Sequence, residues 1–433
     1  MVKTLFDTIY EGYAYTYPHK HSYRRLNNLS LPTLWSAEKK EALFLYLHLP
    51  FCEMRCGFCN LFTIANPQAN MVDDYLKTLA REAKAIKQHI NPRSFGQIAV
   101  GGGTPTFLHW QQLEKLFTII RQLGAQPEQV PTSVEVSPAT VTREKLSLLN
   151  EQGVDRISMG VQSFLENEVK ALGRPQENKE VYAALDLLKQ YPFATINVDL
   201  IYGTYGQTLS TWLHSVQEVI RYNVEEVFIY PLYVRPLTGI TRLSQPQDDN
   251  RFIFYREAKQ LLLSAGYKQV SMRMFQKKGI IQKQAARSYT CQEDGMIGLG
   301  AGARSYTSAV HYSSEYAVAR QNIRSIIQQY IARPNFNEVD YGIELNKEEQ
   351  QRRFVIKSVL HGTGLDLERY NSLYAHDALE AYPLLPELLK ADMASLQNGI
   401  FQLTSMGLDY SDAIGPALYS EPIKQLITEF ELQ

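Results

Sequence analysis

The stretch Leu43-Phe-Leu-Tyr-Leu-His-Leu-Pro-Phe-Cys52-Glu-Met-Arg-Cys56-Gly-Phe-Cys59-Asn60 joins an apolar run to a loop rich in cysteine. Cys52, Cys56 and Cys59 are three of only four cysteines in 433 residues, so one short loop can direct three thiols at a single point. Three thiolates can hold three irons of a [4Fe–4S] cluster and leave the fourth iron open. A structural zinc site needs four protein ligands, and His48 would have to be the fourth. This zinc alternative stays open here, because cysteine clusters in intracellular chains are often zinc sites.

The apolar run at 43–49 is the first of six strand-like segments that alternate with amphipathic stretches as far as about residue 270. The expected strands are 43–49, 97–100, 133–136, 156–159, 195–201 and 227–230. The expected helices are 73–88, 111–123, 143–151, 180–189, 209–222 and 249–265. This alternation predicts an α/β fold with a parallel sheet, a partial (β/α)6 barrel, which irregular strands after Tyr267 would extend.

The composition excludes several classes of function. Lys and Arg number 44 against 45 for Asp and Glu, so no overall field favours nucleic acid or a membrane surface. No apolar run reaches the ~20 residues that span a bilayer, and the N-terminus lacks a signal-peptide pattern. We expect a cytoplasmic protein with free thiols and a small-molecule partner.

Polar or glycine-rich elements follow five of the expected strands, at the ends where parallel barrels build their active sites. The glycines of Gly101-Gly102-Gly103-Thr104 let bare backbone approach a charged group, with a plain tight turn as an equal alternative. Glu135 and Asp199 can accept hydrogen bonds, although a lone acid at a strand end is more often a helix cap. Gln162 can donate and accept, and Arg174 is either a two-point clamp for a carboxylate or a surface arginine.

These motifs together resemble one branch of a known superfamily. The segments 46–52, 101–105, 160–163, 172–174 and 198–203 are similar to the oxygen-independent coproporphyrinogen III oxidase-like branch of the radical S-adenosylmethionine (SAM) superfamily. Cys52, Cys56 and Cys59 have the CxxxCxxC spacing of that superfamily. The resemblance implies a radical SAM barrel in which the cysteines hold a [4Fe–4S] cluster and the open iron binds SAM.

The resemblance also implies roles for the other motif residues. Gly101, Gly102, Gly103 and Thr104 would bind the SAM amino group, and Arg174 its carboxylate. Glu135, Gln162 and Asp199 would contact the ribose and amino groups, and the backbone at Phe58 the adenine. Tyr46, His48 and Cys291 would lie at the reaction site. An electron donor such as flavodoxin or ferredoxin is implied, and one or two SAM molecules.

Three departures from the oxidase leave the substrate undetermined. Leu61 stands where the oxidase has a further cysteine, Glu135 is followed by Val-Ser-Pro, and Arg174 by Pro-Gln. SAM cleavage is expected nonetheless, with oxidation, decarboxylation or methyl or methylene transfer as the reaction. Haem-binding chaperones share this scaffold and form a second hypothesis, and the zinc protein is a third.

The chain divides into an arm at 1–42, the barrel at 43–270, an extension at 271–335 and a C-terminal unit at 336–433. In the arm, Tyr15-Thr-Tyr-Pro-His-Lys20 and Tyr23-Arg-Arg25 could meet an acidic planar substrate or a second SAM, or pack peripherally. Cys291 is either a buried small hydrophobe or, as the resemblance implies for a segment that borders the active site, a hydrogen-atom donor or acceptor or a ligand to substrate.

The C-terminal unit is mostly helical by period, over 350–360, 378–391 and 422–430. A short hairpin near Gly399 resembles that of the winged-helix-like domain that ends the family. With no basic recognition helix we expect a lid or docking domain and no binding of nucleic acid.

Overall fold

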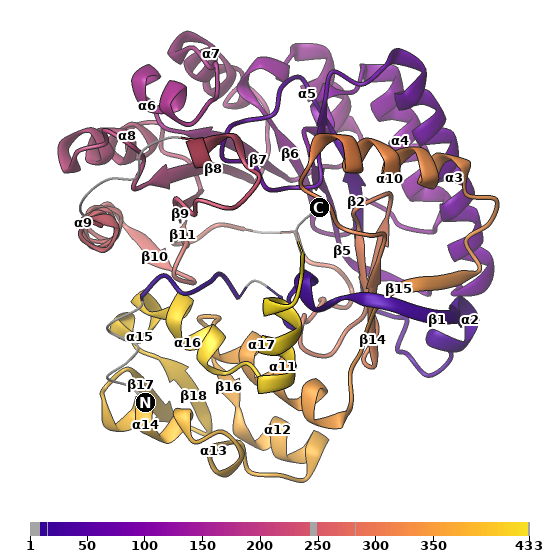
Figure 1. Cartoon of the computed structure of the whole chain (residues 1–433). Coiled ribbons are helices and arrows are strands. Elements are labelled where there is room, and N and C mark those ends of the chain that lie inside the picture. Colours follow the sequence, from indigo (N-terminus) through magenta and orange to yellow (C-terminus); the bar gives the residue numbers. More distant parts are fainter. Residues whose placement is uncertain (1–8, 15, 243–248, 282, 432–433) are drawn as a thin grey trace.

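The computed structural model describes residues 9–14, 16–242, 249–281 and 283–431, so Tyr15 of the arm lies outside the described residues. Its main feature is a sheet ordered β1-β15-β14-β13-β12-β2-β5-β6-β7-β8-β9-β11-β10, with helices along its outer side (Figure 1).

Six consecutive parallel strands form the centre of this sheet, as the sequence predicts. They are β2 (Leu43–Leu49), β5 (Phe95–Gly102), β6 (Thr132–Val136), β7 (Arg156–Gln162), β8 (Thr195–Tyr202) and β9 (Glu226–Pro231). The expected helices are α3 (Ala69–His89), α4 (Trp110–Gln122), α5 (Arg143–Glu151), α7 (Asn178–Leu188), α8 (Leu209–Arg221) and α9 (Arg251–Ser264), with the short α6 (Glu166–Ala171) before α7. The predicted α/β fold with a partial (β/α)6 barrel is therefore confirmed.

Later strands extend the sheet at both edges. Beyond β9 lie the antiparallel strands β11 (Met274–Lys277) and β10 (Tyr267–Gln269), while β12 (Met296–Leu299) pairs in parallel with β2. Antiparallel strands β13 (Arg304–Tyr306), β14 (Val310–Ser313), β15 (Glu338–Glu344) and β1 (Arg24–Ser30) complete that edge, with α2 (Leu31–Leu34) after β1 and α10 (Arg320–Ala332) before β15. The extension after Tyr267 is confirmed, and residues 338–344 of the C-terminal segment belong to this large sheet.

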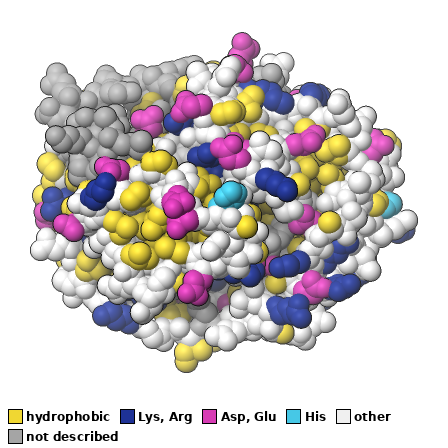
Figure 2. Space-filling model, turned by 90° about the horizontal axis from the view of Figure 1, so that it is seen from below, with side chains coloured by type: hydrophobic (Ala, Val, Ile, Leu, Met, Phe, Trp, Pro, Cys, Tyr) yellow, Lys and Arg dark blue, Asp and Glu magenta, His cyan; other side chains and the backbone are white. Residues whose placement is uncertain are grey.

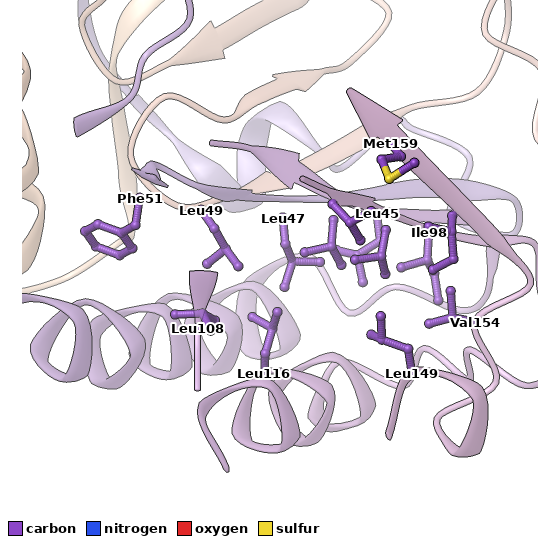
Figure 3. Packing of buried hydrophobic residues seen from close by; sticks show 14 of the residues in the cluster. Leu45, Leu47, Leu49, Phe51, Ile98, Leu108, Leu116, Leu149, Val154 and Met159 are labelled. Carbon is purple, nitrogen blue, oxygen red and sulfur yellow. The ribbon is translucent and has the colours of Figure 1, made fainter. Parts of the chain in front are cut away.

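Strand β2 shows why the sheet separates an apolar outer layer from a polar interior. Because side chains alternate along a strand, the leucines at 43, 45, 47 and 49 share one face, and all four are fully buried. Figure 3 shows Leu45, Leu47 and Leu49 pointing toward the helices that carry Leu116 and Leu149. The alternate residues Tyr46 and His48 face the other way, where their side chains form a hydrogen bond of 3.2 Å.

The C-terminal unit packs a small sheet against short helices. Its strands are β16 (Leu365–Asp366), β18 (Ile400–Leu403) and β17 (Ala394–Gln397), and its helices α11 (Lys347–Val359), α12 (Leu367–Tyr374), α13 (Ala378–Ala381), α14 (Leu384–Lys390), α15 (Ser405–Asp409), α16 (Ser411–Ala417) and α17 (Glu421–Thr428). The helix expected over 378–391 is divided, because a residue before proline disfavours helical backbone and Tyr382 precedes Pro383 with ψ 86°. Asn398 and Gly399, both with positive φ, form the hairpin turn between β17 and β18.

The N-terminal arm runs between the barrel and the C-terminal unit (Figure 1). The N–H of Gly12 donates to the carbonyl of Asp412 at 3.1 Å, and the fully buried Tyr17 bonds through its hydroxyl to Glu349 and Ser420. Beside the arm, Arg273 from the loop between β10 and β11 donates Nη1–H to Asp412 Oδ1 at 2.7 Å. Both side chains are almost completely buried, at 4% and 1% exposed. This ion pair joins the sheet to α16.

No helix of the described residues has the length and apolar character to cross a membrane. Figure 2 shows the molecule from below the view of Figure 1. Lys, Arg, Asp and Glu side chains are interspersed on this face, in agreement with a formal net charge of −1.

We expect Asp412→Ala to lower the free energy of unfolding by about 3–5 kcal/mol, because it leaves the buried Arg273 guanidinium without its partner. Urea unfolding measures this change in the free energy of unfolding. Glu41→Ala is the matched control: it breaks an ion pair to Arg93, whose side chain is 74% exposed, and should cost less than about 1 kcal/mol. Similar losses in the two variants would show that Asp412 does not fasten the C-terminal unit.

Candidate functional site

A pocket opens at the carboxyl ends of the parallel strands, where the sequence places its motifs. Predicted site residues that line it are Cys52, Cys56, Phe58, Cys59, Gly102, Gly103, Thr104, Glu135, Gln162, Arg174 and Asp199. Gly101 is in close contact with Glu135, because a Cβ at Gly101 would stand 2.7 Å from the Glu135 carboxylate. The structure therefore brings together residues that are up to 147 positions apart in the sequence.

The cysteine loop is fastened by backbone hydrogen bonds on two sides. β3 (Phe51–Cys52) pairs with β4 (Ile64–Ala65) and closes the loop at its base. At the tip, the N–H of Gly57 donates to the carbonyl of Leu172 at 2.9 Å. A Cβ at Gly57 would stand 2.9 Å from that carbonyl oxygen, so only glycine allows this approach.

The three thiols each face a polar neighbour. Thr104 Oγ1 lies 3.8 Å from Cys52 Sγ, Thr63 Oγ1 lies 3.8 Å from Cys59 Sγ, and Arg174 Nη1 lies 3.3 Å from Cys56 Sγ. Burial, and then the neighbouring Cys59, raises the pKa of Cys52 to about 12, and burial also raises the pKa of Cys59. Without a bound cation the Cys52 and Cys59 groups are therefore neutral thiols, and a metal centre would have to displace their protons.

In the glycine turn after β5, the backbone lies in close contact with neighbouring residues. Gly102 has φ +111°, and a Cβ there would stand 2.6 Å from the His48 ring. A Cβ at Gly103 would stand 2.4 Å from the carbonyl oxygen of Phe51 and 2.9 Å from Cys52 Sγ. The turn therefore does more than reverse the chain, because it lets bare backbone reach the cysteine loop and the pocket.

Glu135 and Asp199 extend from the ends of β6 and β8 into the pocket. The helices that follow these strands are capped by Thr142 and Thr208 instead, so neither acid is a helix cap. Glu135 Oε2 accepts the N–H of Gly102 at 3.1 Å, and Asp199 Oδ1 accepts from Asn197 Nδ2 at 2.8 Å. The Glu135 side chain is exposed to the space of the pocket, whereas that of Asp199 is half-buried. The protein around the pocket desolvates both carboxylates, which raises the pKa of Glu135 to about 7 and that of Asp199 to about 6.

Arg174 lies inside the pocket rather than on the surface. Its Nη2–H donates to the Gly160 carbonyl at 2.8 Å and its Nε–H to Gln176 Oε1 at 2.8 Å, while Nη1 faces Cys56. Gln176 is itself held by a bond to the carbonyl of Val161 at 2.9 Å. Gln162, near the end of β7, has φ 71° and lies at a bulge in the pairing of β7 with β8. The bulge turns the buried Gln162 side chain toward the pocket.

His48 does not suit the zinc alternative. Its Nε2 lies 2.9 Å from the carbonyl oxygen of Phe62, which can only accept, so Nε2 carries the proton. Nδ1 then accepts from the hydroxyl of Tyr46. Both ring nitrogens are engaged beneath the glycine turn. Among the residues that the structure describes, no three His, Cys, Asp or Glu side chains are grouped as ligands of a single ion.

Cys291 is not among the residues that line the pocket. Cys291 lies just before β12. There the N–H of Phe44, at the start of β2, donates to the Gly295 carbonyl, so Cys291 is near the amino end of the parallel strands. Arg353 donates Nη2–H to the carbonyl of Cys291 at 2.7 Å. The segment is therefore held against α11 and not against the cysteine loop.

Sequence reasoning missed polar residues that lie one layer below the motif residues. Asn197 and Ser158 share the pocket-side face of β8 and β7, and their side chains form a hydrogen bond of 2.8 Å. Asn197 Oδ1 is buried and finds no partner among the described residues. Asn197 stands two positions before Asp199, so the alternation of side chains along the strand was a usable signal.

Comparison with known proteins agrees with this geometry. Residues 46–219 match the family described as the radical SAM superfamily. The haem chaperone HemW of Bacillus subtilis is 31% identical over 268 residues, which cover 60% of this chain and 70% of the relative. The oxygen-independent coproporphyrinogen III oxidase of Salmonella typhimurium is 27% identical over 385 residues, covering 84% and 82% of the two chains. The solved structure of coproporphyrinogen III oxidase (HemN) from Escherichia coli superposes with a TM-score of 0.78 at 23% identity, over 94% of this chain and 96% of that one.

The raised pKa of Glu135 predicts a pH dependence of stability. Between pH 4.5, which is the ordinary pKa of the carboxyl group, and about pH 7, Glu135 keeps a proton in the folded protein that it has released in the unfolded chain. The stabilisation from this proton is therefore complete below about pH 4.5 and is lost as the pH rises through 7. In the absence of ligands we expect Glu135→Gln to lose less stability than the unsubstituted protein between about pH 5 and about pH 8, measured by urea unfolding.

Glu114→Gln, on the exposed side of α4, is the control and should follow the unsubstituted protein. An unchanged pH dependence in Glu135→Gln would mean that water in the pocket keeps the pKa of Glu135 near its ordinary value.

Proposed function

Because this chain belongs to the radical SAM superfamily, in the branch of coproporphyrinogen III oxidase-like proteins and haem chaperones, we propose that it is a radical SAM enzyme acting on a small molecule. Cys52, Cys56 and Cys59 would hold a [4Fe–4S] cluster, and the adjoining pocket would hold SAM. The substrate would be an acidic or aromatic compound, and a flavodoxin or ferredoxin would supply the electron.

The observation that carries the proposal is that three thiols, a bare glycine turn, a fixed arginine and two carboxylates line one pocket. Three cysteines suit a cluster with one open iron, whereas a structural zinc ion needs four protein ligands. A Cβ at Gly103 would collide with Cys52 and Phe51, so the turn provides a cradle that a side chain would fill. Asp199 is itself held in place, because Asn197, which is fully buried, donates to Asp199 Oδ1 at 2.8 Å.

When bound together, the cluster and SAM supply a 5′-deoxyadenosyl radical for hydrogen abstraction. The residues of this chain bind and orient. Arg174, fixed by Gly160 and Gln176, presents positive charge beside Cys56 and suits the methionyl carboxylate. With a pKa of about 7, Glu135 can accept from an ammonium group or, when protonated, donate to a hydroxyl. Asp199 accepts from ribose or amino groups.

The pocket is compatible with more than one reaction on the substrate. Leu61, where the oxidase has a cysteine, lines the pocket and is 48% exposed. A leucine there offers apolar surface and no thiol, which favours a substrate and product different from those of the oxidase. Oxidation and methyl or methylene transfer both fit, with one or two SAM molecules. Formation of S-adenosylhomocysteine beside 5′-deoxyadenosine would identify methyl transfer.

A haem-binding chaperone is the second candidate, favoured by the 31% identity to HemW over 70% of that protein's length. Two measurements on the reconstituted protein separate the candidates. Stoichiometric binding in a spectroscopic haem titration, with no 5′-deoxyadenosine from SAM, would support the chaperone. Formation of 5′-deoxyadenosine without haem binding would support the enzyme.

We expect Cys52→Ala, Cys56→Ala and Cys59→Ala each to abolish the charge-transfer absorbance of the anaerobically reconstituted protein and all formation of 5′-deoxyadenosine. Cys291→Ala is the matched control and should keep the absorbance, because this cysteine lies outside the pocket. Analysis of iron and sulfide tests the zinc alternative in the same samples. Loss of the cluster in Cys291→Ala alone would overturn the ligand assignment.

We expect Arg174→Ala and Asp199→Ala to keep the cluster but to bind SAM roughly ten- to a hundred-fold more weakly, because each loses a charge-assisted hydrogen bond of about 1.5–3 kcal/mol. Arg174→Lys should recover only part of the affinity, since an ammonium lacks the planar fork. Equilibrium binding of SAM measures both effects. Arg221→Ala, which removes a cation from the outer side of α8, is the control. Unchanged affinity in Arg174→Ala or Asp199→Ala would remove that residue from the SAM site.

A further inference from the structure

Thr63 is a buried polar residue of the pocket that lies outside the motifs. It directly precedes β4, lines the pocket beside the cysteine loop and is only 1% exposed. Its hydroxyl oxygen lies 3.8 Å from Cys59 Sγ, within the range of a hydrogen bond to sulfur. The structure therefore places a hydroxyl group against the third thiol of the loop.

The backbone of Thr63 is fixed on both sides by hydrogen bonds of its neighbours. Nε2–H of His48 donates to the carbonyl of Phe62 at 2.9 Å. The N–H of Ile64 donates to the carbonyl of Pro50 at 2.7 Å. Because the peptide groups before and after Thr63 are both held, the residue stays beside the cysteine loop. This contact also gives the buried His48 ring a function, since the ring holds the segment that carries Thr63.

The direction of the hydrogen bond between Thr63 and Cys59 depends on the state of the sulfur. In the free thiol either group can donate. A cysteine that ligates a metal centre has lost its proton, so its sulfur can only accept and the Thr63 hydroxyl has to donate. Hydrogen bonds to the sulfurs are one of the factors that set the reduction potential of an iron–sulfur cluster. A donor stabilises the reduced state, because that state carries one more negative charge.

The polar neighbours of the other two thiols have a second task in the proposed function. Arg174 faces Cys56 at 3.3 Å and Thr104 faces Cys52 at 3.8 Å, and both residues belong to the set proposed to bind SAM. In the part of the chain that the structure describes, the Thr63 hydroxyl has no hydrogen-bond partner besides Cys59. A change at Thr63 can therefore be tested apart from the binding of SAM.

We propose that Thr63 is a positioning residue that donates a hydrogen bond to Cys59 and thereby raises the reduction potential of the cluster. The inference rests on the proposed function, because it requires the cluster, and it names a residue that sets how readily the cluster is reduced. The step concerned is the transfer of one electron from a reduced flavodoxin or ferredoxin to the oxidised cluster. No covalent bond forms or breaks in this step, and the Thr63 hydroxyl keeps its proton.

The test compares midpoint potentials of the anaerobically reconstituted full-length protein without SAM. They are measured by titration with dithionite and electron paramagnetic resonance of the reduced cluster. Thr63→Val removes the hydroxyl group and should make reduction about three- to ten-fold less favourable, which lowers the potential of a one-electron couple by about 30–60 mV. Thr63→Ser keeps a hydroxyl group and should restore most of the potential.

Thr132→Val is the matched control. Thr132 is also 1% exposed, but it begins β6 at the amino end of the sheet, where its hydroxyl donates to the carbonyl of Pro127. Its substitution should leave the potential unchanged. Iron and sulfide analysis measures the cluster content of each variant, and equilibrium binding measures its affinity for SAM, which we expect to be unchanged in Thr63→Val.

An unchanged potential in Thr63→Val would overturn the inference. An equally low potential in Thr63→Ser would also overturn it, because the effect would then come from packing rather than from the hydroxyl. If Thr63→Val took up no cluster, Thr63 would be needed to build the loop, and if it bound SAM more weakly, Thr63 would belong to the SAM site. Either result would contradict the role proposed here.

The proposed function is tested separately in the unsubstituted protein, by its iron and sulfide content and by formation of 5′-deoxyadenosine. An unsubstituted protein that takes up no cluster would overturn both conclusions. A protein that holds the cluster and forms 5′-deoxyadenosine, but whose potential does not respond to Thr63→Val, would overturn only the role of Thr63. A response of the potential without any 5′-deoxyadenosine would support the role of Thr63 and contradict the proposed enzyme.

Discussion

The close backbone contact between the cysteine loop and the turn after β5 is the constraint on which the site depends. The N–H of Gly103 donates to the carbonyl of Leu49 at 2.7 Å, and the N–H of Thr104 donates to the carbonyl of Phe51 at 2.8 Å. Any side chain at Gly103 would separate the two segments. Since Cys52 directly follows Phe51, these bonds fix the first thiol relative to the end of β5. The bond from Gly57 to Leu172 fixes the tip of the loop, and thereby Cys56, against Arg174.

The parallel sheet makes this contact stable while leaving the interior polar. Alternation along β2 sends leucines into the helical layer and Tyr46 and His48 inward, and the same alternation places Asn197 and Asp199 inward on β8. Inward polar groups are costly unless they are paired, and most of them are, through Arg156–Glu226, Ser158–Asn197 and Gly102–Glu135. The carboxylates with raised pKa values lie at the pocket end of this layer, where a ligand rather than a protein group would complete their hydrogen bonds.

Local features of the chain were predictable from the sequence, and contacts over long separations were not. The six strands and their helices follow from periodicity, and the cysteines and glycines follow from spacing within a few residues. The pairing of Arg24 with Gly342 and of Met296 with Phe44 left no local signal, because the paired strands lie more than 250 positions apart in the sequence. Arg174 taken by itself was better interpreted as a surface residue, since only the folded chain brings Gly160 and Cys56 to it. The position of Cys291 depended in the same way on the return of β12 to lie beside β2.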